Sequence, residues 1–208
     1  MTTKTTNLTR LASGFTLLVG LFVSTSVSAT LLSGGLNVDN GYVAYVSTDD
    51  SIAGTQISAG NNWPSTLTFS GVNLQANQDY FLHIFAYDQG GIAGLLGEFS
   101  LSGSDHTFAN GGSSLLSNTS DWLVSTSGWA SYVSPTSLGL NGVSPWGLRP
   151  AVDSSAEWIW SADANNHNEV YFSTSITAVN SGTVPEPGTL LLLGAGLAGL
   201  AMRKKKAV

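Results

Sequence analysis

The residue types that enzymes use for catalysis are few in this chain, and their spacing fits no common catalytic motif. Its three histidines, His83, His106 and His167, lie outside the His-Glu-x-x-His zinc pattern, and no Gly-x-Ser-x-Gly nucleophile elbow occurs. The run Ser104–His106 contains the residue types of a catalytic triad, but neighbours in a chain point apart, so we predict a turn there. We therefore expect no catalytic residues and no enzymatic activity.

Two glutamates, Glu157 and Glu169, flank what we predict to be a β-hairpin and could suggest a glycosidase pair. If the hairpin turns between Ser161 and Glu169, the two carboxylates lie four residues apart along the ladder. At about 3.4 Å per residue this is roughly 13–14 Å, beyond the ~5–9.5 Å that glycosidases use. The spacing argues against that mechanism.

An oxygen-rich segment, Asp163–Glu169, is the candidate metal site. It places Asp163, Asn165, His167 and Glu169 at alternate positions, and the oxygen ligands among them, Asp163, Asn165 and Glu169, suit calcium. The segment lacks the glycine and the distal glutamate of an EF-hand loop, and the alternative is ordinary turn chemistry. We expect no other cofactor. Three aspartates are further possible oxygen donors: Asp49, Asp50 and Asp88.

Six tryptophans could stack on sugar rings if their side chains were exposed. Strand alternation places Trp158 and Trp160 on one face, which is either a core stripe or a binding platform. We favour the core for this pair.

These residues must be positioned by the body of the chain, Thr30–Val184, which is rich in glycine, serine and asparagine. Short β-rich runs recur between turn residues, and no run has a helical period. The pattern predicts an all-β fold, an antiparallel β-sandwich that is jelly-roll-like, with a parallel β-helix as the competing fold. "YFLHIFAY" (residues 80–87) is apolar at both odd and even positions, which indicates a central strand covered on both faces. The runs that we predict as strands are residues 41–48, 65–72, 79–88, 97–102, 128–133, 156–161 and 169–179.

The charge of the body excludes one class of partner. Twelve acidic residues face a single arginine, Arg149, between residues 30 and 184, so a nucleic-acid backbone would be repelled. The chain has no cysteine, so the body must fold without disulfides.

The first 29 residues have the layout of a secretory signal peptide. Lys4 and Arg10 form the charged start, Phe15–Val23 is the apolar run, and small residues precede a predicted signal-peptidase cleavage between Ala29 and Thr30. We therefore expect export, with the mature protein beginning at Thr30.

The other end of the chain, residues 185–208, has the layout of a membrane-processing signal. The uncharged run Leu190–Met202 would form a helix of roughly 20 Å, short against a hydrocarbon core of about 30 Å. Pro185 and Pro187 cannot lie inside that helix, so we predict an extended, exposed segment before a short transmembrane helix. The basic residues that follow should stay cytoplasmic: Arg203, Lys204, Lys205 and Lys206.

These residues resemble the PEP-CTERM sorting signal of proteins exported by Gram-negative bacteria that make extracellular polysaccharide. Pro185, Glu186 and Pro187 match its motif, and the apolar run and basic end follow in the same order. The resemblance implies exosortase, a membrane-embedded transpeptidase, as the partner that cleaves the signal. It implies an inner-membrane precursor with its body outside the cytoplasm, and then a cell-surface or extracellular product.

The body has a second, fainter resemblance. Residues 74–91 and 156–176 resemble the strand pairs of exported jelly-roll modules related to galactose-binding-like domains. Together the two resemblances imply a non-enzymatic protein of the extracellular polysaccharide, acting as a matrix component or weak glycan binder. The alternative is a secreted polysaccharide-active enzyme whose site has no recognisable motif.

Overall fold

The computed structural model describes residues 29–179 and 194–196. The predicted signal peptide up to residue 28, the Pro185–Pro187 motif, most of the apolar run and the basic end lie outside these residues and stay predictions. Residues 194–196, inside the predicted apolar run, form a single helical turn. Over residues 29–179 and 194–196, no helix is both long and apolar enough to cross a bilayer.

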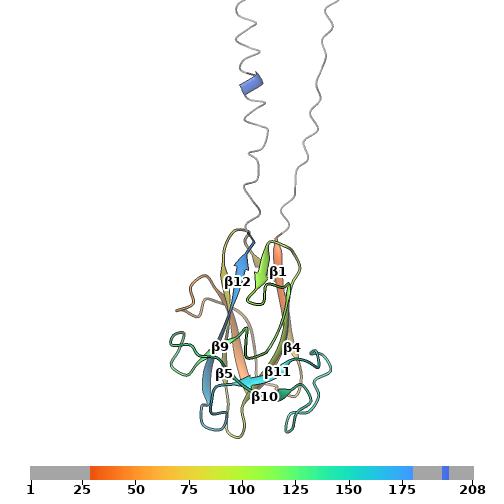
Figure 1. Ribbon diagram of the computed structural model, residues 1–208, viewed down its shortest axis with the longest axis vertical. Helices are drawn as coiled ribbons and strands as arrows, with labels where there is room; N and C mark the ends of the chain where they lie inside the picture. The colour runs from red at the N-terminus through yellow and green to blue at the C-terminus, as the bar shows by residue number, and fades with distance from the viewer. Residues whose placement is uncertain (1–28, 180–193, 197–208) are drawn as a thin grey trace, which may run out of the picture. The chain divides into compact units, whose positions relative to one another are not determined.

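The described body is built of β-strands that form two antiparallel sheets (Figure 1). One sheet has the order β10-β11-β6-β1-β4, with β8 also paired to β6; the second has the order β3-β2-β5-β12-β7, with β9 also paired to β12. The predicted all-β, antiparallel class is confirmed. The strands are β1 (Thr30–Asp39), β2 (Gly41–Ser47), β3 (Thr55–Gly60), β4 (Leu67–Leu74), β5 (Tyr80–Tyr87), β6 (Gly94–Leu101), β7 (His106–Phe108), β8 (Ser114–Leu116), β9 (Leu123–Ser125), β10 (Thr136–Leu140), β11 (Glu157–Trp160) and β12 (Glu169–Ala178).

The two sheets share one hydrophobic core. Leu36 and Phe99 enter it from the first sheet, and Ile84 and Phe172 enter it from the second; all four side chains are fully buried. Side chains of alternate residues bring each sheet's apolar face to this core, which is the arrangement of a sandwich.

The two tryptophans of β11 do not share a face, so that prediction is wrong. Trp160 packs in the main core, with its ring centroid 5.7 Å from that of Phe172. Trp158 packs in a smaller cluster with Trp146, their rings stacked at 4.5 Å. Trp160 is the last residue of β11, where strand alternation no longer fixes the side-chain direction. Both side chains are fully buried, so neither forms a platform.

β5 is a central strand between β2 and β12, as its two-sided apolar pattern predicts. Leu82, Ile84 and Ala86 belong to the shared core. The alternate residues, which include Phe81, His83 and Phe85, therefore lie on the outer face of the sheet. His83 is nonetheless fully buried, so other segments must cover that outer face.

The strand β1 was not predicted from the sequence, because it contains two neighbouring glycines, Gly34 and Gly35, and adjacent glycines usually mark a turn. In the structure Gly34 makes room for aromatic rings: a Cβ there would lie 2.5 Å from Phe99 Cδ1 and 3.0 Å from the ring of Phe69. The rings of Phe69 and Phe99 lie 6.4 Å apart across this position. The glycine therefore belongs to a packed strand where another group approaches closely.

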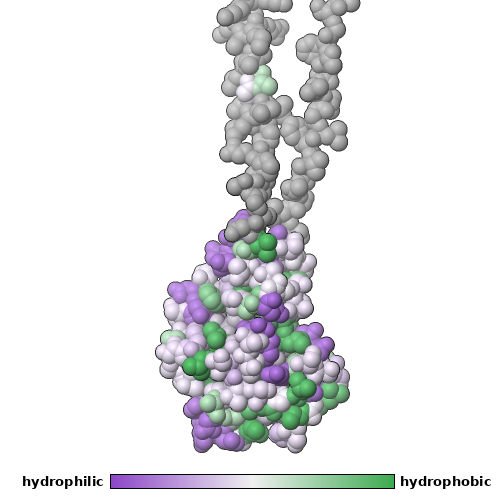
Figure 2. Space-filling view, viewed as in Figure 1, coloured by the Kyte–Doolittle hydropathy of each residue, from purple (hydrophilic) through white to green (hydrophobic). Residues whose placement is uncertain are grey.

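On the face of the β domain visible in Figure 2, apolar residues form small separate patches among neutral and hydrophilic ones. Scattered exposed apolar residues of this kind are normal on a soluble domain and mark no interface by themselves. The large exposed hydrophobic residues include Ile52, Leu123, Val133, Leu140 and Leu148.

The packing at Gly34 gives a testable prediction. Gly34→Ala should lower the free energy of unfolding by about 1–3 kcal/mol, because its methyl group collides with a buried ring. Gly35→Ala is the matched control, since its Cβ would lie 3.1 Å from a threonine methyl group that can shift. Urea denaturation of the two variants measures the difference. Equal stability of both variants and the native protein would contradict this account of β1.

Candidate functional site

The predicted calcium segment is a closed turn in the structure. Asp163 accepts hydrogen bonds from the backbone N–H of Asn165 at 3.1 Å and from the Asn166 side chain at 2.8 Å. The Asn166 side chain and the Asn165 N–H lower the pKa of Asp163. Glu169 is exposed at the start of β12. Within the described ranges, no three Asp, Glu, His or Cys side chains are arranged to hold a metal ion. Calcium binding through Asp163, Asn165 and Glu169 stays a prediction.

Glu157 and Glu169 do not flank a hairpin, so that expectation is wrong. Glu157 begins β11 in one sheet and Glu169 begins β12 in the other. The segment between them crosses from one sheet to the other. The sequence does not reveal this crossing, because two β-rich runs on either side of an Asn-rich turn also fit a hairpin.

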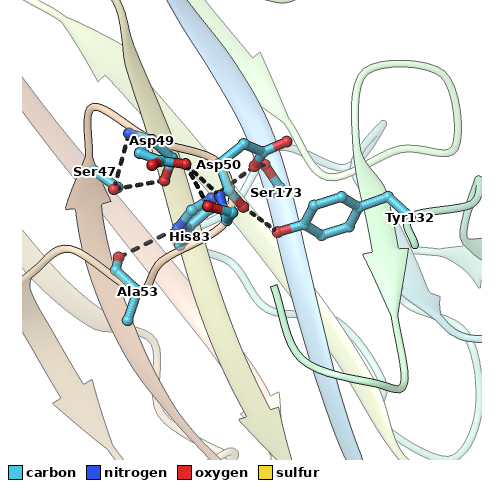
Figure 3. Close-up of polar contacts among 8 residues, drawn as sticks. Ser47, Asp49, Asp50, Ala53, His83, Tyr132 and Ser173 are labelled. Atoms are coloured by element: carbon cyan, nitrogen blue, oxygen red, sulfur yellow. Dashed lines mark hydrogen bonds and ion pairs between the residues drawn. The ribbon is translucent and has the colours of Figure 1, made fainter. Parts of the chain in front are cut away.

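The structure brings His83 and Asp50 together on the outer face of the second sheet (Figure 3). His83 Nε2 lies 2.8 Å from Asp50 Oδ1, and His83 Nδ1 lies 3.2 Å from the Ala53 carbonyl oxygen. Ser173 of β12 donates its hydroxyl to the same Asp50 oxygen at 2.5 Å. The imidazole is fully buried, while the Asp50 side chain is 33 % exposed.

The turn that carries Asp50 is fixed by its own serines. Asp49 accepts hydrogen bonds from the N–H and the hydroxyl of Ser51 at 2.8 and 2.6 Å. These bonds, the hydroxyl first, lower the pKa of Asp49. Ser47 Oγ donates to the Asp49 carbonyl at 2.7 Å. This local chemistry, which aspartate and serine favour in turns, presents Asp50 to the sheet.

The contacts of His83 occupy both of its ring nitrogens. A carbonyl oxygen can only accept, so Nδ1 must donate to Ala53. Nε2 faces a carboxylate oxygen that already accepts a bond from Ser173, so it too must donate if Asp50 is ionised. Both ring nitrogens of the buried His83 therefore have a partner, as buried polar groups require.

This constellation of Asp, His and Ser differs from a catalytic triad. In a triad the serine hydroxyl bonds to the imidazole, which then takes its proton. Here Ser173 bonds to Asp50, and both nitrogens of the buried His83 ring are occupied. The ring has no free nitrogen to act as a general base.

Aromatic side chains cover the His83 ring. Trp129 stacks on it with the ring centroids 4.4 Å apart and the planes 18° apart, a geometry suited to a cation–π contact with an imidazolium. Tyr45 and Tyr171 meet Trp129 edge-on at 6.0 and 5.0 Å, and Phe85 continues the row at 5.1 Å from Tyr171. We name these four half-buried residues, Tyr45, Trp129, Tyr171 and Phe85, the aromatic row.

Tyr132 ties the segment that carries Trp129 to the Asp50 turn. Its hydroxyl donates to the Asp50 carbonyl oxygen at 3.1 Å (Figure 3). Burial raises the pKa of Tyr132, and the nearby Asp50 charge raises it further. The segment 128–133, predicted as a strand, makes only one isolated bridge, between Val133 and Val124. It serves as a cover over the sheet.

Sequence reasoning left His83 outside any catalytic motif and named Asp50 as a possible oxygen donor, but it missed their pairing. The two residues are 33 positions apart, and no motif relates them. The available signal was a polar, ionisable residue in the middle of a strand whose odd and even positions are both apolar. Such a residue needs a partner, and the nearest acidic turn in the neighbouring hairpin supplies it.

The comparisons with known proteins concern the end of the chain. Residues 183–206 match the family model described as the PEP-CTERM protein-sorting motif. The chain carries a PEP-CTERM sorting motif. The match includes Pro185–Pro187 and Arg203–Lys206, which confirms the recognition made from those residues. It implies an exported, cell-surface-directed protein that exosortase processes.

The comparisons found no such match for the body. No curated protein and no solved structure matches the chain significantly. The resemblance of the body to galactose-binding-like modules is therefore not supported by these comparisons.

The His83–Asp50 pair gives a second prediction. Asp50→Ala leaves Nε2 of a fully buried ring without a partner and should cost about 1–3 kcal/mol of stability. Asp50→Asn keeps an amide that can bond to a neutral imidazole and should cost less. Urea denaturation followed by tryptophan fluorescence measures both effects, since Trp129 lies on the His83 ring. A native-like midpoint for Asp50→Ala would show that the pair does not hold this face together.

Proposed function

We propose that this protein is exported, cleaved at its sorting motif by exosortase, and acts non-enzymatically in extracellular polysaccharide. Its role is that of a matrix component or weak glycan binder. Residues 1–29 are the signal peptide, 30–184 the exported body and 185–208 the sorting signal. Before cleavage, the tail holds the precursor in the inner membrane with its body outside the cytoplasm.

The observation that carries this proposal is the PEP-CTERM motif at residues 183–206. Its parts have separate physical roles: the prolines interrupt any helix, the apolar run enters the bilayer, and the basic cluster stays on the cytoplasmic side. The twelve acidic residues of the body suit a soluble exported domain.

The chemistry of the outer face supports a non-enzymatic role. Both ring nitrogens of His83 are engaged, and Ser173 is turned to a carboxylate instead of an imidazole. Trp129 of the aromatic row lies on the His83 ring, and the whole row is only half-buried. Aromatic rings present large, rigid apolar surfaces with polar edges, and such surfaces suit weak contact with sugar rings.

One observation favours the alternative, a polysaccharide-active enzyme. Asp50 and Asp121 line the same pocket, and glycosidases use two carboxylates around the bond they cleave. Asp50 Oδ1 is bonded to both His83 and Ser173, so this carboxylate is tied into the packing of the outer face. We therefore favour the non-enzymatic role.

The sorting step is tested at the motif. Replacing Pro185, Glu186 and Pro187 together with alanine should leave a full-length, membrane-retained precursor, because a continuous helix removes the extended segment that a protease can grip. Mass spectrometry and membrane fractionation of the exporting cell measure this. Pro150→Ala, at an exposed proline of the body, is the control and should be processed normally. An unchanged mature mass in the triple variant would contradict processing at the motif.

The role in polysaccharide is tested with the exported protein and the polysaccharide of the same cell. We expect the protein to be retained on the immobilised polymer and to release no reducing sugar from it. Measurable release of sugar that Asp121→Asn abolishes would favour the enzyme instead. A protein that is neither retained nor active would overturn both readings.

A further inference from the structure

The edge of β12 is open over two residues. β9 pairs with β12 at Tyr171–Ser173, and β7 pairs with the same edge at Ile176–Ala178. Thr174 and Ser175 lie between these ladders and pair with neither strand. A strand edge without a ladder partner presents backbone polar groups that need other partners.

A pocket of about 240 Å³ opens at this gap. That volume is room for about eight water molecules at their share of the liquid, the size of one small polar ligand such as a single sugar ring. The residues that line it include Asp50, Phe81, Asp121, Leu123, Ser173 and Ser175.

The carboxylates of the pocket are held in place and keep acceptor capacity. Asp50 is fixed through Oδ1 by His83 and Ser173, and among the described residues its Oδ2 makes no hydrogen bond. Asp121 accepts a bond from the Asn118 side chain at Oδ2, which leaves Oδ1 without a bond to the described part of the chain. Neither oxygen is buried, so both can accept hydrogen bonds from a ligand.

The rest of the pocket has the mixed character that sugar sites need. Phe81 is half-buried and Leu123 is 42 % exposed, so an apolar surface faces the carboxylates. Ser175 adds a hydroxyl at the open edge. Ligand sites generally combine an apolar wall with a few convergent polar groups. A sugar ring has this complementarity, with apolar C–H faces and a rim of hydroxyl donors.

We propose that the pocket at the β12 gap binds one neutral sugar unit of a polysaccharide. The free carboxylate oxygens of Asp50 and Asp121 accept its hydroxyl groups, and Phe81 packs against its apolar face. This proposal rests on the proposed glycan-binding role and adds to it a pocket that is distinct from the aromatic row. The pocket lining contains two carboxylates and neither lysine nor arginine, so it repels uronic acids and other anionic sugars.

Ligand-observed nuclear magnetic resonance on the exported, purified protein tests this. The probes are methyl glucoside, methyl galactoside and, as the charged counterpart, methyl glucuronide. We expect binding of at least one neutral probe, with the glucuronide at least tenfold weaker. Ser175→Tyr fills the pocket and should weaken binding of the neutral probe at least tenfold. Ser100→Tyr, at an exposed serine of β6 in the other sheet, is the matched control and should leave it unchanged.

A second pair of variants does not depend on filling the pocket. Asp121→Asn removes a charge at constant size and should weaken binding of the neutral probe several-fold. Because the charge is gone, the difference in affinity between the neutral probe and the glucuronide should also become smaller. Asp153→Asn is its control, because Asp153 lies in an exposed turn that asparagine also forms. Failure of both neutral probes to bind, equal binding of glucuronide, or unchanged binding by Ser175→Tyr and Asp121→Asn would each overturn the assignment. If the Ser175→Tyr variant binds the whole polysaccharide as tightly as the native protein does, the assignment of the pocket is wrong and the proposed function stands. If the native protein itself is not retained on the polysaccharide, both the pocket assignment and the proposed function are overturned.

Discussion

The contact between His83 and Asp50 organises the outer face of the second sheet. β5 carries apolar residues on both faces, so its outer side must be covered as well as its inner side. The covering segments have little regular structure and need a fixed point. Asp50 supplies it, since its side chain bonds to His83 and Ser173 while its carbonyl accepts from Tyr132. Trp129 then closes over the imidazole. The contacts of Asp50 thus join its turn to two strands and a loop.

The rest of the body has few charged contacts of this kind. Arg149 is its single basic side chain, and it donates to the Pro64 carbonyl at 2.6 Å and lies 5.2 Å from the centre of the Trp63 ring. It therefore holds loops together, and it forms no ion pair with a carboxylate of residues 29–179. Where acids meet, they repel: burial raises the pKa of Asp39, and the charge of Asp88 raises it further. Without disulfides, the fold depends on its shared core and on local hydrogen bonds.

How far the sequence predicted this structure depended on how local each feature is. Strands rich in aromatic and β-branched residues, such as β2, β5 and β12, were predicted within a residue or two of their bounds. β1 was missed because its glycines serve ring packing, and the short strands β7 to β9 have too few residues for a period to show. The sorting motif is a linear signal, read by the order of its residues, and it was recognised. The His83–Asp50 pair depends on which strands become neighbours, and no local pattern contains that information.

The position of β12 has a mechanical consequence. Among the described residues of the body this strand is the last before the sorting motif, and it is hydrogen-bonded to β5 on one side and to β9 and β7 on the other. Inter-strand hydrogen bonds run perpendicular to the strands, so a pull along the chain beyond Ala178 loads the whole eight-pair ladder with β5 in shear. Bonds loaded together resist more force than bonds opened one at a time. A load applied to the body through this strand is therefore shared by the eight pairs of one ladder.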